Sequence, residues 1–311
     1  MVDKKLVSIV IPVYNGAKSI ADLVSLLIDT LLVKYKLEIV LVNDCSPDNS
    51  EEVCIAVFEK YKENVKFFSL SKNVGEHNAV MAGLNQVTGD YTVIMDDDFQ
   101  NPVSEVIKLI EFAIESENDV VYTFYDKKEH SYFRNLGSKF NDIVANILLK
   151  KPKKLYLSSF KIINKFLVKE IIKYNLPFPY IDGLILRTTN NIGKIKVEHN
   201  KRVEGKSNYT LRKLVSLWMN MFTNFSILPL RFSLGVGFFF SLFGFGYGIF
   251  AVIEKNLNPN LPMGYTTIII LVSLFSGIQL MALGMVGEYL GRMFISQNKK
   301  PQYSIRKSFT K

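Results

Sequence analysis

Two long uncharged segments near the C-terminal end constrain the fold of this chain more than any other feature. Residues 232–253 and 265–287 contain no Asp, Glu, Lys or Arg, and a short polar link with two prolines separates them. A helix rises about 1.5 Å per residue, so about 20 residues cross a hydrocarbon core of about 30 Å. A buried helical hairpin of a soluble protein is the alternative, but buried core segments are usually shorter. We therefore expect two transmembrane helices.

The charge of the rest of the chain is strongly positive. Lys and Arg number 38 against 29 Asp and Glu, a formal net charge of +9. This excess favours an anionic partner, such as a phosphorylated substrate or the lipid bilayer, and no nucleic-acid recognition module is visible. The segment after Arg292 is rich in Lys and Arg, whereas the link between the uncharged segments holds one Lys and one Glu. The positive-inside tendency therefore predicts that both termini are cytoplasmic.

The N-terminal part of the chain alternates strand-like and helix-like segments. Helices are predicted at residues 17–32, after Ser50, near 77–87 and at 102–117. Strands are predicted at 6–12, 37–42, 65–70, 91–95 and 119–124, and then at 158–164 and 192–198. Strands that alternate with helices predict an α/β fold with a doubly wound, mostly parallel sheet. Such a sheet binds its ligands at the carboxyl ends of the strands.

A polar cluster follows each of the first four predicted strands. The clusters are Pro12-Val13-Tyr14-Asn15, Asn43-Asp44-Cys45-Ser46-Pro47-Asp48, Asn73-Val74-Gly75 and Asp96-Asp97-Asp98-Phe99-Gln100. Parallel strands place their carboxyl ends at one edge of a sheet, so the clusters are expected to meet there. This coincidence predicts a ligand-binding site at that edge.

The fourth cluster has the composition of a metal site. Adjacent carboxylates repel and are costly to bury, so they often share a cation. In a strand, Asp96 and Asp98 point to one side and Asp97 to the other. Two carboxylates at i and i+2, with Gln100 at i+4, suit a hard divalent ion, Mg²⁺ or Mn²⁺, that keeps open positions for a diphosphate. A solvated acidic turn is the alternative interpretation.

The four clusters, in this order, resemble glycosyltransferase family 2, and their spacing is similar to that of its polyprenyl-phosphate glycosyltransferases. The resemblance extends to a basic loop with Arg202, Gly205, Ser207 and Tyr209, and to Gly287-Glu288-Tyr289-Leu290-Gly291-Arg292. It implies a nucleotide-sugar-binding fold of the GT-A type, followed by two transmembrane helices in the bacterial inner membrane. The implied segments are a cytoplasmic glycosyltransferase domain at 1–206, juxtamembrane interfacial helices at 207–231, a transmembrane hairpin at 232–291 and a basic cytoplasmic tail at 292–311.

The resemblance also implies roles for individual residues. The residues expected to bind the nucleotide are Pro12, Tyr14, Asn15, Asp44, Ser46, Asn73, Gly75 and Asp96. The residues expected to bind the metal are Asp96, Asp98 and Gln100. The residues expected to contact an acceptor phosphate are Arg134, Lys139, Ser159, Lys161, Arg202, Ser207 and Tyr209. The residues expected to act in catalysis are Asp98, Lys161 and Arg202.

The implied reaction is inverting and metal-dependent. A sugar passes from a nucleoside diphosphate sugar, which we expect to be UDP-linked, to a polyprenyl phosphate that serves cell-envelope glycan synthesis or modification. The expected partners are thus the donor, the lipid acceptor and the bilayer, together with a second copy of the chain through the transmembrane helices.

Three positions depart from the family pattern. Gly16 stands where relatives often have Glu, Asn208 where many have Lys, and Ser159-Phe160-Lys161 where many have Asp-Phe-Arg. The missing aspartate does not exclude catalysis, because a phosphate monoester has a second pKa of about 6 and is already largely dianionic. Such an acceptor needs positioning and charge neutralisation more than a base, and Lys161 and Arg202 are expected to supply them.

Two other classes of protein share some of these features. A processive polysaccharide synthase would use a polysaccharide acceptor, but it normally carries a Gln-x-x-Arg-Trp motif and more spans, and neither is present. A degenerate transferase that acts as a non-catalytic scaffold or lipid-carrier partner would account for Gly16 and Ser159. The complete acidic motif at residues 96–100 argues against it.

Overall fold

The structure is a computed structural model that describes residues 4–125, 152, 155–198, 228–258, 264–298 and 301–311. These residues form two units. The first unit combines the described residues up to Glu198 with residues 301–311, and the second consists of residues 228–298. The predicted juxtamembrane helices at 207–231 lie outside the described residues except for their last four positions, which belong to a long helix.

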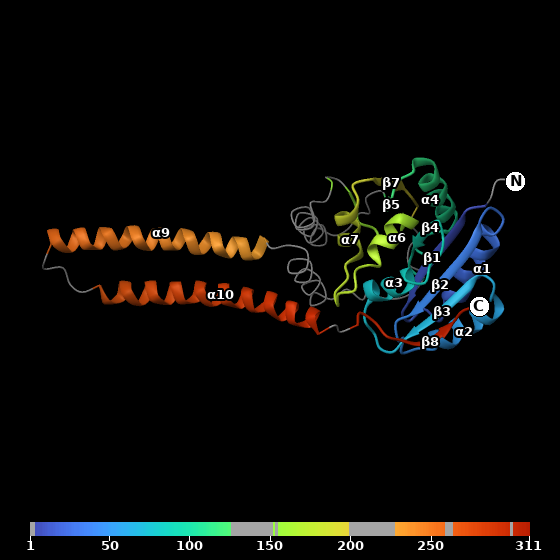
Figure 1. Ribbon diagram of the computed structural model, residues 1–311, viewed down its shortest axis with the longest axis horizontal. Coiled ribbons are helices and arrows are strands. Elements are labelled where there is room, and N and C mark those ends of the chain that lie inside the picture. Colours follow the sequence, from blue (N-terminus) through green and yellow to red (C-terminus); the bar gives the residue numbers. More distant parts are fainter. Residues whose placement is uncertain (1–3, 126–151, 153–154, 199–227, 259–263, 299–300) are drawn as a thin grey trace. The chain divides into compact units, whose positions relative to one another are not determined.

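The first unit is built on a sheet of eight strands in the order β7-β5-β6-β4-β1-β2-β3-β8 (Figure 1). The strands are β1 (Leu6–Val13), β2 (Lys36–Asn43), β3 (Val65–Leu70), β4 (Tyr91–Ile94), β5 (Val120–Phe124), β6 (Lys161–Asn164), β7 (Ile192–Lys196) and β8 (Ile305–Phe309). Strands β1 to β4 are parallel, and β7 is parallel to β5. By contrast, β6 is antiparallel to β4 and β5, and β8 to β3. The predicted α/β fold is confirmed.

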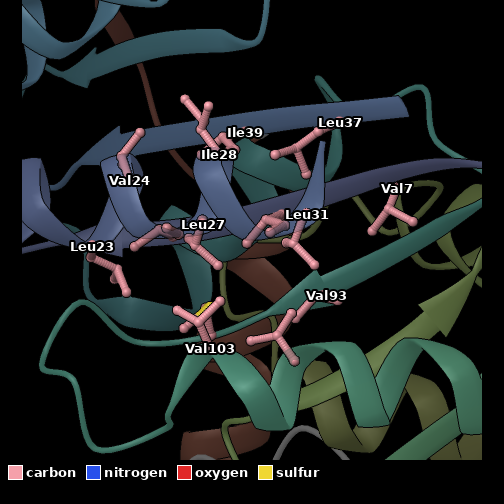
Figure 2. Close-up of a cluster of buried hydrophobic side chains, with 14 of the residues drawn as sticks. Val7, Leu23, Val24, Leu27, Ile28, Leu31, Leu37, Ile39, Val93 and Val103 are labelled. Atoms are coloured by element: carbon pink, nitrogen blue, oxygen red, sulfur yellow. The ribbon is translucent and has the colours of Figure 1, made fainter. Parts of the chain in front are cut away.

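Helices cover both faces of this sheet. They are α1 (Ile20–Leu31), α2 (Ser50–Lys60), α3 (Glu76–Leu84), α4 (Val103–Ser116), α6 (Lys165–Ile171) and α7 (Ile181–Thr188). Apolar residues at helical spacing give α1 one buried face, and Figure 2 shows its Leu27 and Leu31 in one cluster with Val93 of β4 and Val103 of α4. Each fully buried leucine side chain stabilises the fold by about 1.5–3 kcal/mol.

Three described elements of the first unit do not follow from the sequence pattern. Helices α6 and α7 are short, and β8 lies in a segment for which the sequence predicts only a basic tail. Most side chains of β8 are exposed, so the strand lacks the alternation of apolar and polar residues that marks a half-buried strand. Only its pairing with β3 identifies it as a strand.

The second unit is a pair of long helices, α9 (Leu228–Leu257) and α10 (Tyr265–Gln297). The rings of Phe240 on α9 and Phe275 on α10 meet edge to face, 6.3 Å apart between centroids. Both helices are long and apolar enough to cross a membrane, over Leu230–Phe250 and Leu274–Gln297, and the side chains there are exposed. Apolar helices whose side chains stay exposed over this length favour an apolar surrounding over water. The prediction of two long apolar helices in this part of the chain is confirmed.

Candidate active site

The polar clusters come together at one edge of the sheet. Strands β1 to β4 are parallel, so the loops that follow them leave from the same edge. Strand β6 runs antiparallel to β4 with Lys161 opposite Ile94, which brings the residues just before β6 to this edge as well. The structure therefore groups the four predicted clusters with Ser159.

Hydrogen bonds join the loops after β1 and β2. The backbone N–H of Asn15 donates to Ser46 Oγ at 3.2 Å, and that of Gly16 donates to Ser50 Oγ at 2.9 Å. The N–H of Asp44 donates to the carbonyl of Val13 at 3.0 Å. Asn15 has a positive φ of 60°, a conformation that Asn tolerates better than most residues. The loops form one platform, and the exposed ring of Tyr14 borders it.

Asp44 links this platform to the loop after β3. Its carboxylate is buried and accepts hydrogen bonds from the N–H groups of Val74 at 2.7 Å and Gly75 at 2.8 Å. Burial raises the pKa of Asp44, and the two N–H donors oppose that effect. Gly75 has a φ of 88°, which only glycine adopts without strain. Asp44 therefore holds the Asn73–Gly75 loop against the platform.

The acidic motif lies just beyond β4. The strand ends at Ile94 and residues 97–99 form a bend, so the strand alternation used to place Asp96 and Asp98 on one face does not apply. Asp98 Oδ1 accepts a hydrogen bond from the N–H of Gln100 at 3.1 Å, and Phe99 has a positive φ of 57°. All three aspartates are partly exposed, but the Oδ2 atom of Asp97 is buried.

The surroundings of Asp96 fit a divalent cation. Its Oδ2 accepts a hydrogen bond from Ser159 Oγ at 2.8 Å. Burial raises the pKa of Asp96 to about 7, the carboxylates of Glu76 and Asp98 act in the same direction, and the Ser159 hydrogen bond opposes them. A cation would relieve this crowding of negative charge. Among the described residues no three His, Cys, Asp or Glu side chains form a metal site by themselves. Mg²⁺ commonly uses only one or two carboxylates together with substrate phosphates, so Asp96 and Asp98 suffice.

Lys161 lies in a buried ion pair that the sequence did not predict. Its ammonium group pairs with Asp182 Oδ1 from α7, and Tyr122 of β5 donates a hydrogen bond to the same oxygen at 2.8 Å. The ammonium also lies 5.1 Å from the centre of the Tyr122 ring. Only 4% of the Lys161 side chain is exposed. The predicted contact between Lys161 and an acceptor phosphate therefore competes with an internal partner.

Several residues of the site fall outside the sequence prediction. Asp182 and Tyr122 belong to segments with no motif, although a carboxylate between two apolar residues, as in Ile181-Asp182-Gly183-Leu184, is a weak signal for a buried ionic role. His77 packs edge to face on Tyr180, 5.1 Å between ring centroids, and burial lowers its pKa to about 4, which keeps it neutral at pH 7.

The predicted residues that lie outside the described part of the chain are Arg134, Lys139, Arg202, Ser207 and Tyr209.

Gly16 has a steric reason for its departure from the family pattern. A Cβ atom at this position would lie 1.9 Å from Asp97 Oδ2 and 3.0 Å from Val13 Cγ1. The Asp97 carboxylate thus occupies the space that a side chain at position 16 would need. We expect Gly16→Ala to destabilise the protein by about 1–3 kcal/mol through this overpacking. Thermal unfolding of the purified chain measures the change.

The matched control is a double-mutant cycle with Asp97→Ala. If the two side chains compete for one space, Gly16→Ala/Asp97→Ala is more stable than the sum of the single changes by about 1 kcal/mol or more. Strictly additive losses would show that Asp97 does not set the choice of glycine at this position.

Two protein-family models together match most of the chain. Residues 8–174 match the model described as glycosyl transferase family 2, and residues 228–293 match the model described as GtrB C-terminal hairpin. The first match covers most of β1, all of β2 to β6 and the loops that carry the four polar clusters.

Relatives and solved structures agree with these matches. The undecaprenyl-phosphate 4-deoxy-4-formamido-L-arabinose transferase of Yersinia enterocolitica is 31% identical over 306 residues, 97% of this chain and 93% of the relative. The enzyme of that name from Yersinia pestis strain Pestoides F is 31% identical over 310 residues, with the same coverage. Glucosyl-3-phosphoglycerate synthase from Mycobacterium tuberculosis, crystallised with UDP, has a TM-score of 0.51 at 18% identity, over 69% of this chain and 76% of the synthase. The last similarity concerns the fold alone.

Proposed function

From the premise that this chain belongs to glycosyltransferase family 2 and is a glycosyltransferase of the polyprenyl-phosphate sugar transferase type, we propose its substrates and mechanism. The donor is a UDP-linked sugar, the acceptor is the phosphate of a polyprenyl lipid, and transfer inverts the anomeric configuration with the help of a divalent ion. The observation that carries this proposal is the position of Asp96 and Asp98 at the edge where the loops after β1, β2 and β3 meet.

The donor half of the site uses residues that the structure already holds in place. The platform of Asn15 and Ser46 and the loop that Asp44 ties down are the surfaces offered to the nucleotide. Ser159 orients the Asp96 carboxylate through its hydrogen bond. A divalent ion held by Asp96 and Asp98, with Gln100 beside them, would neutralise the diphosphate and stabilise it as the leaving group.

The acceptor half needs no general base. A polyprenyl phosphate is largely dianionic at pH 7, so its attacking oxygen has no proton to lose. Ser159 in place of an aspartate is therefore compatible with catalysis. Because Lys161 of β6 is paired with Asp182 of α7, we assign it the role of holding α7 against β6. We propose that Arg134, Lys139, Arg202, Ser207 and Tyr209 bind the acceptor phosphate.

The sheet supports a topology with both termini on one side of the membrane. Strand β8 follows the helical hairpin in sequence yet pairs with β3, which precedes it. This pairing supports an arrangement in which both ends of the hairpin lie on one side of the membrane, as two crossings would give. The basic tail makes the cytoplasm the favoured side.

The test is a transfer assay with the full chain in detergent or vesicles. We expect one nucleotide sugar from a panel, a UDP-linked one, to yield a lipid product whose mass equals undecaprenyl phosphate plus one glycosyl residue, which is the sugar less one water. Mn²⁺ and Mg²⁺ are each added in turn, and the anomeric configuration of the product is read by NMR. The panel includes UDP-linked, GDP-linked and dTDP-linked sugars.

The matched acceptor control is undecaprenol, which has the same chain but no phosphate. Transfer to undecaprenol at a comparable rate would contradict the argument that an anionic oxygen replaces the base. A GDP-linked or dTDP-linked donor that exceeds every UDP-linked one would refute the donor assignment and leave the acceptor assignment standing.

A further inference from the structure

The C-terminal strand β8 reaches the loop that the proposed function assigns to the donor. It pairs antiparallel with β3, from Phe67 opposite Phe309 to Leu70 opposite Ile305. Beyond the strand, the N–H of Ser71 donates to the carbonyl of Ser304 at 2.9 Å. Ser71 begins the short connection to the Asn73–Gly75 loop that Asp44 holds. The tail is thus bonded to the start of that connection.

An aromatic contact anchors the far end of the strand. The ring of Phe309 stacks on Phe67 of β3, with 5.6 Å between centroids and 26° between planes, and it also meets Phe58 of α2 at 5.7 Å. Such aromatic pairs contribute beyond the burial of their area. Further back, the side-chain amide of Gln302 donates to the carbonyls of Tyr174 and Leu176, at 2.8 Å and 2.7 Å. The tail is therefore held along its length.

A hydrogen-bond network leads from the same strand into the loop after β2. Lys307 Nζ contacts Glu51 Oε1 at 2.5 Å, and Ser69 Oγ donates to Glu51 Oε2 at 2.5 Å. Ser69 is fully buried and accepts from Asn43 Nδ2 at 3.3 Å. Asn43 Oδ1 in turn accepts from the N–H of Ser46 at 3.2 Å. The ammonium of Lys307 and the hydroxyl of Ser69 lower the pKa of Glu51. The Glu51 carboxylate therefore stays charged and binds both Lys307 and Ser69.

We propose that β8 is a positioning element for the donor site, which holds the loops after β2 and β3 in the conformation that receives the nucleotide. This inference rests on the proposed function, because it takes these loops as the donor site. Lys307 and Phe309 act through β3 and Glu51 and touch no substrate, so they are positioning residues. A released tail would leave residues 71–75 to be ordered at the moment of binding.

The test is the full chain with Lys307→Ala and Phe309→Ala combined. We expect the Kd for UDP and the KM for the donor to rise about tenfold, the cost of ordering about one backbone residue on binding. The acceptor KM and kcat change less than about twofold. Amide hydrogen exchange of residues 71–75 becomes faster in the protein without ligand. Lys307→Arg alone, which keeps both Phe309 and the charge beside Glu51, should retain most of the wild-type donor affinity.

The matched control is Lys311→Ala, which removes an exposed ion pair with Glu63 from the same tail. It should leave both UDP affinity and hydrogen exchange unchanged. Unchanged exchange at 71–75 in the double variant, or faster exchange with unchanged UDP affinity, would overturn the proposal and reduce β8 to a structural strand. If the wild-type chain binds no nucleotide, the proposed donor fails, whereas the exchange measurement still decides whether β8 orders the loop.

Discussion

Asp98→Asn is expected to lower kcat/KM for sugar transfer by about a hundredfold or more while leaving the fold intact. The substitution removes one of two carboxylate charges beside the proposed diphosphate, and losing one such electrostatic group typically costs 10²–10³-fold in rate. Asparagine keeps an oxygen that can accept the hydrogen bond from the N–H of Gln100, so the bend at residues 97–99 is retained. Initial rates measured across a titration of Mn²⁺ or Mg²⁺ should show that the variant needs more metal.

Asp29→Asn near the end of α1 is the matched control, because it changes the same charge on an exposed residue at the end of the helix that leads away from the site. It should retain wild-type activity. The metal assignment fails if Asp98→Asn transfers sugar at the wild-type rate, or if an excess of chelator leaves the wild-type enzyme fully active.

Lys161→Met is expected to destabilise the first unit by about 3–5 kcal/mol, because it leaves the Asp182 carboxylate buried without its cation. For a unit of this size, the loss corresponds to a fall in Tm on the order of 10 °C. Thermal unfolding of the full chain in detergent measures it. In the double variant Lys161→Met/Asp182→Asn no charge is left buried, and the Asn oxygen still accepts the hydrogen bond from Tyr122. We expect it to regain most of the lost stability.

The control is Lys173→Ala, which removes an exposed ion pair with Glu170 near the end of α6. Exposed pairs contribute about 0–1 kcal/mol, so its Tm should barely change. A Lys161→Met protein with wild-type Tm and a weakened acceptor KM would instead mean that Lys161 faces the acceptor phosphate, the role that the sequence predicts.

Much of the fold could be predicted from the sequence, because the patterns that indicate strands and helices lie within single segments of the chain. The apolar, β-branched runs that became β1, β2 and β3 and the helical spacing of α1 each arise within one segment, and so do the uncharged stretches of α9 and α10. The polar clusters were predictable for the same reason: each follows its own strand, and parallel pairing then brings the strand ends to one edge.

The contacts within the site depend on pairs of residues that no local pattern connects. Asp182 becomes the partner of Lys161 only because α7 packs beside β6 and β5, and a buried charge then requires an opposite charge nearby. Gly16 is explained only by the direction of the Asp97 side chain, which the bend after β4 decides. One of the two departures that suggested a degenerate enzyme, Gly16, thus has a steric reason.

By itself the sequence determined the alternating α/β pattern, the apolar hairpin and the polar loops, because periodicity, run length and turn residues act over a few neighbours. Tertiary structure alone decided that Ile305–Phe309 would be a strand, since its exposed, basic side chains carry no strand signal. The open edge of β3 supplies the backbone partners, and Phe67 and Phe58 supply the surface that receives Phe309. A strand whose stability comes from its partner is visible only once that partner is in place.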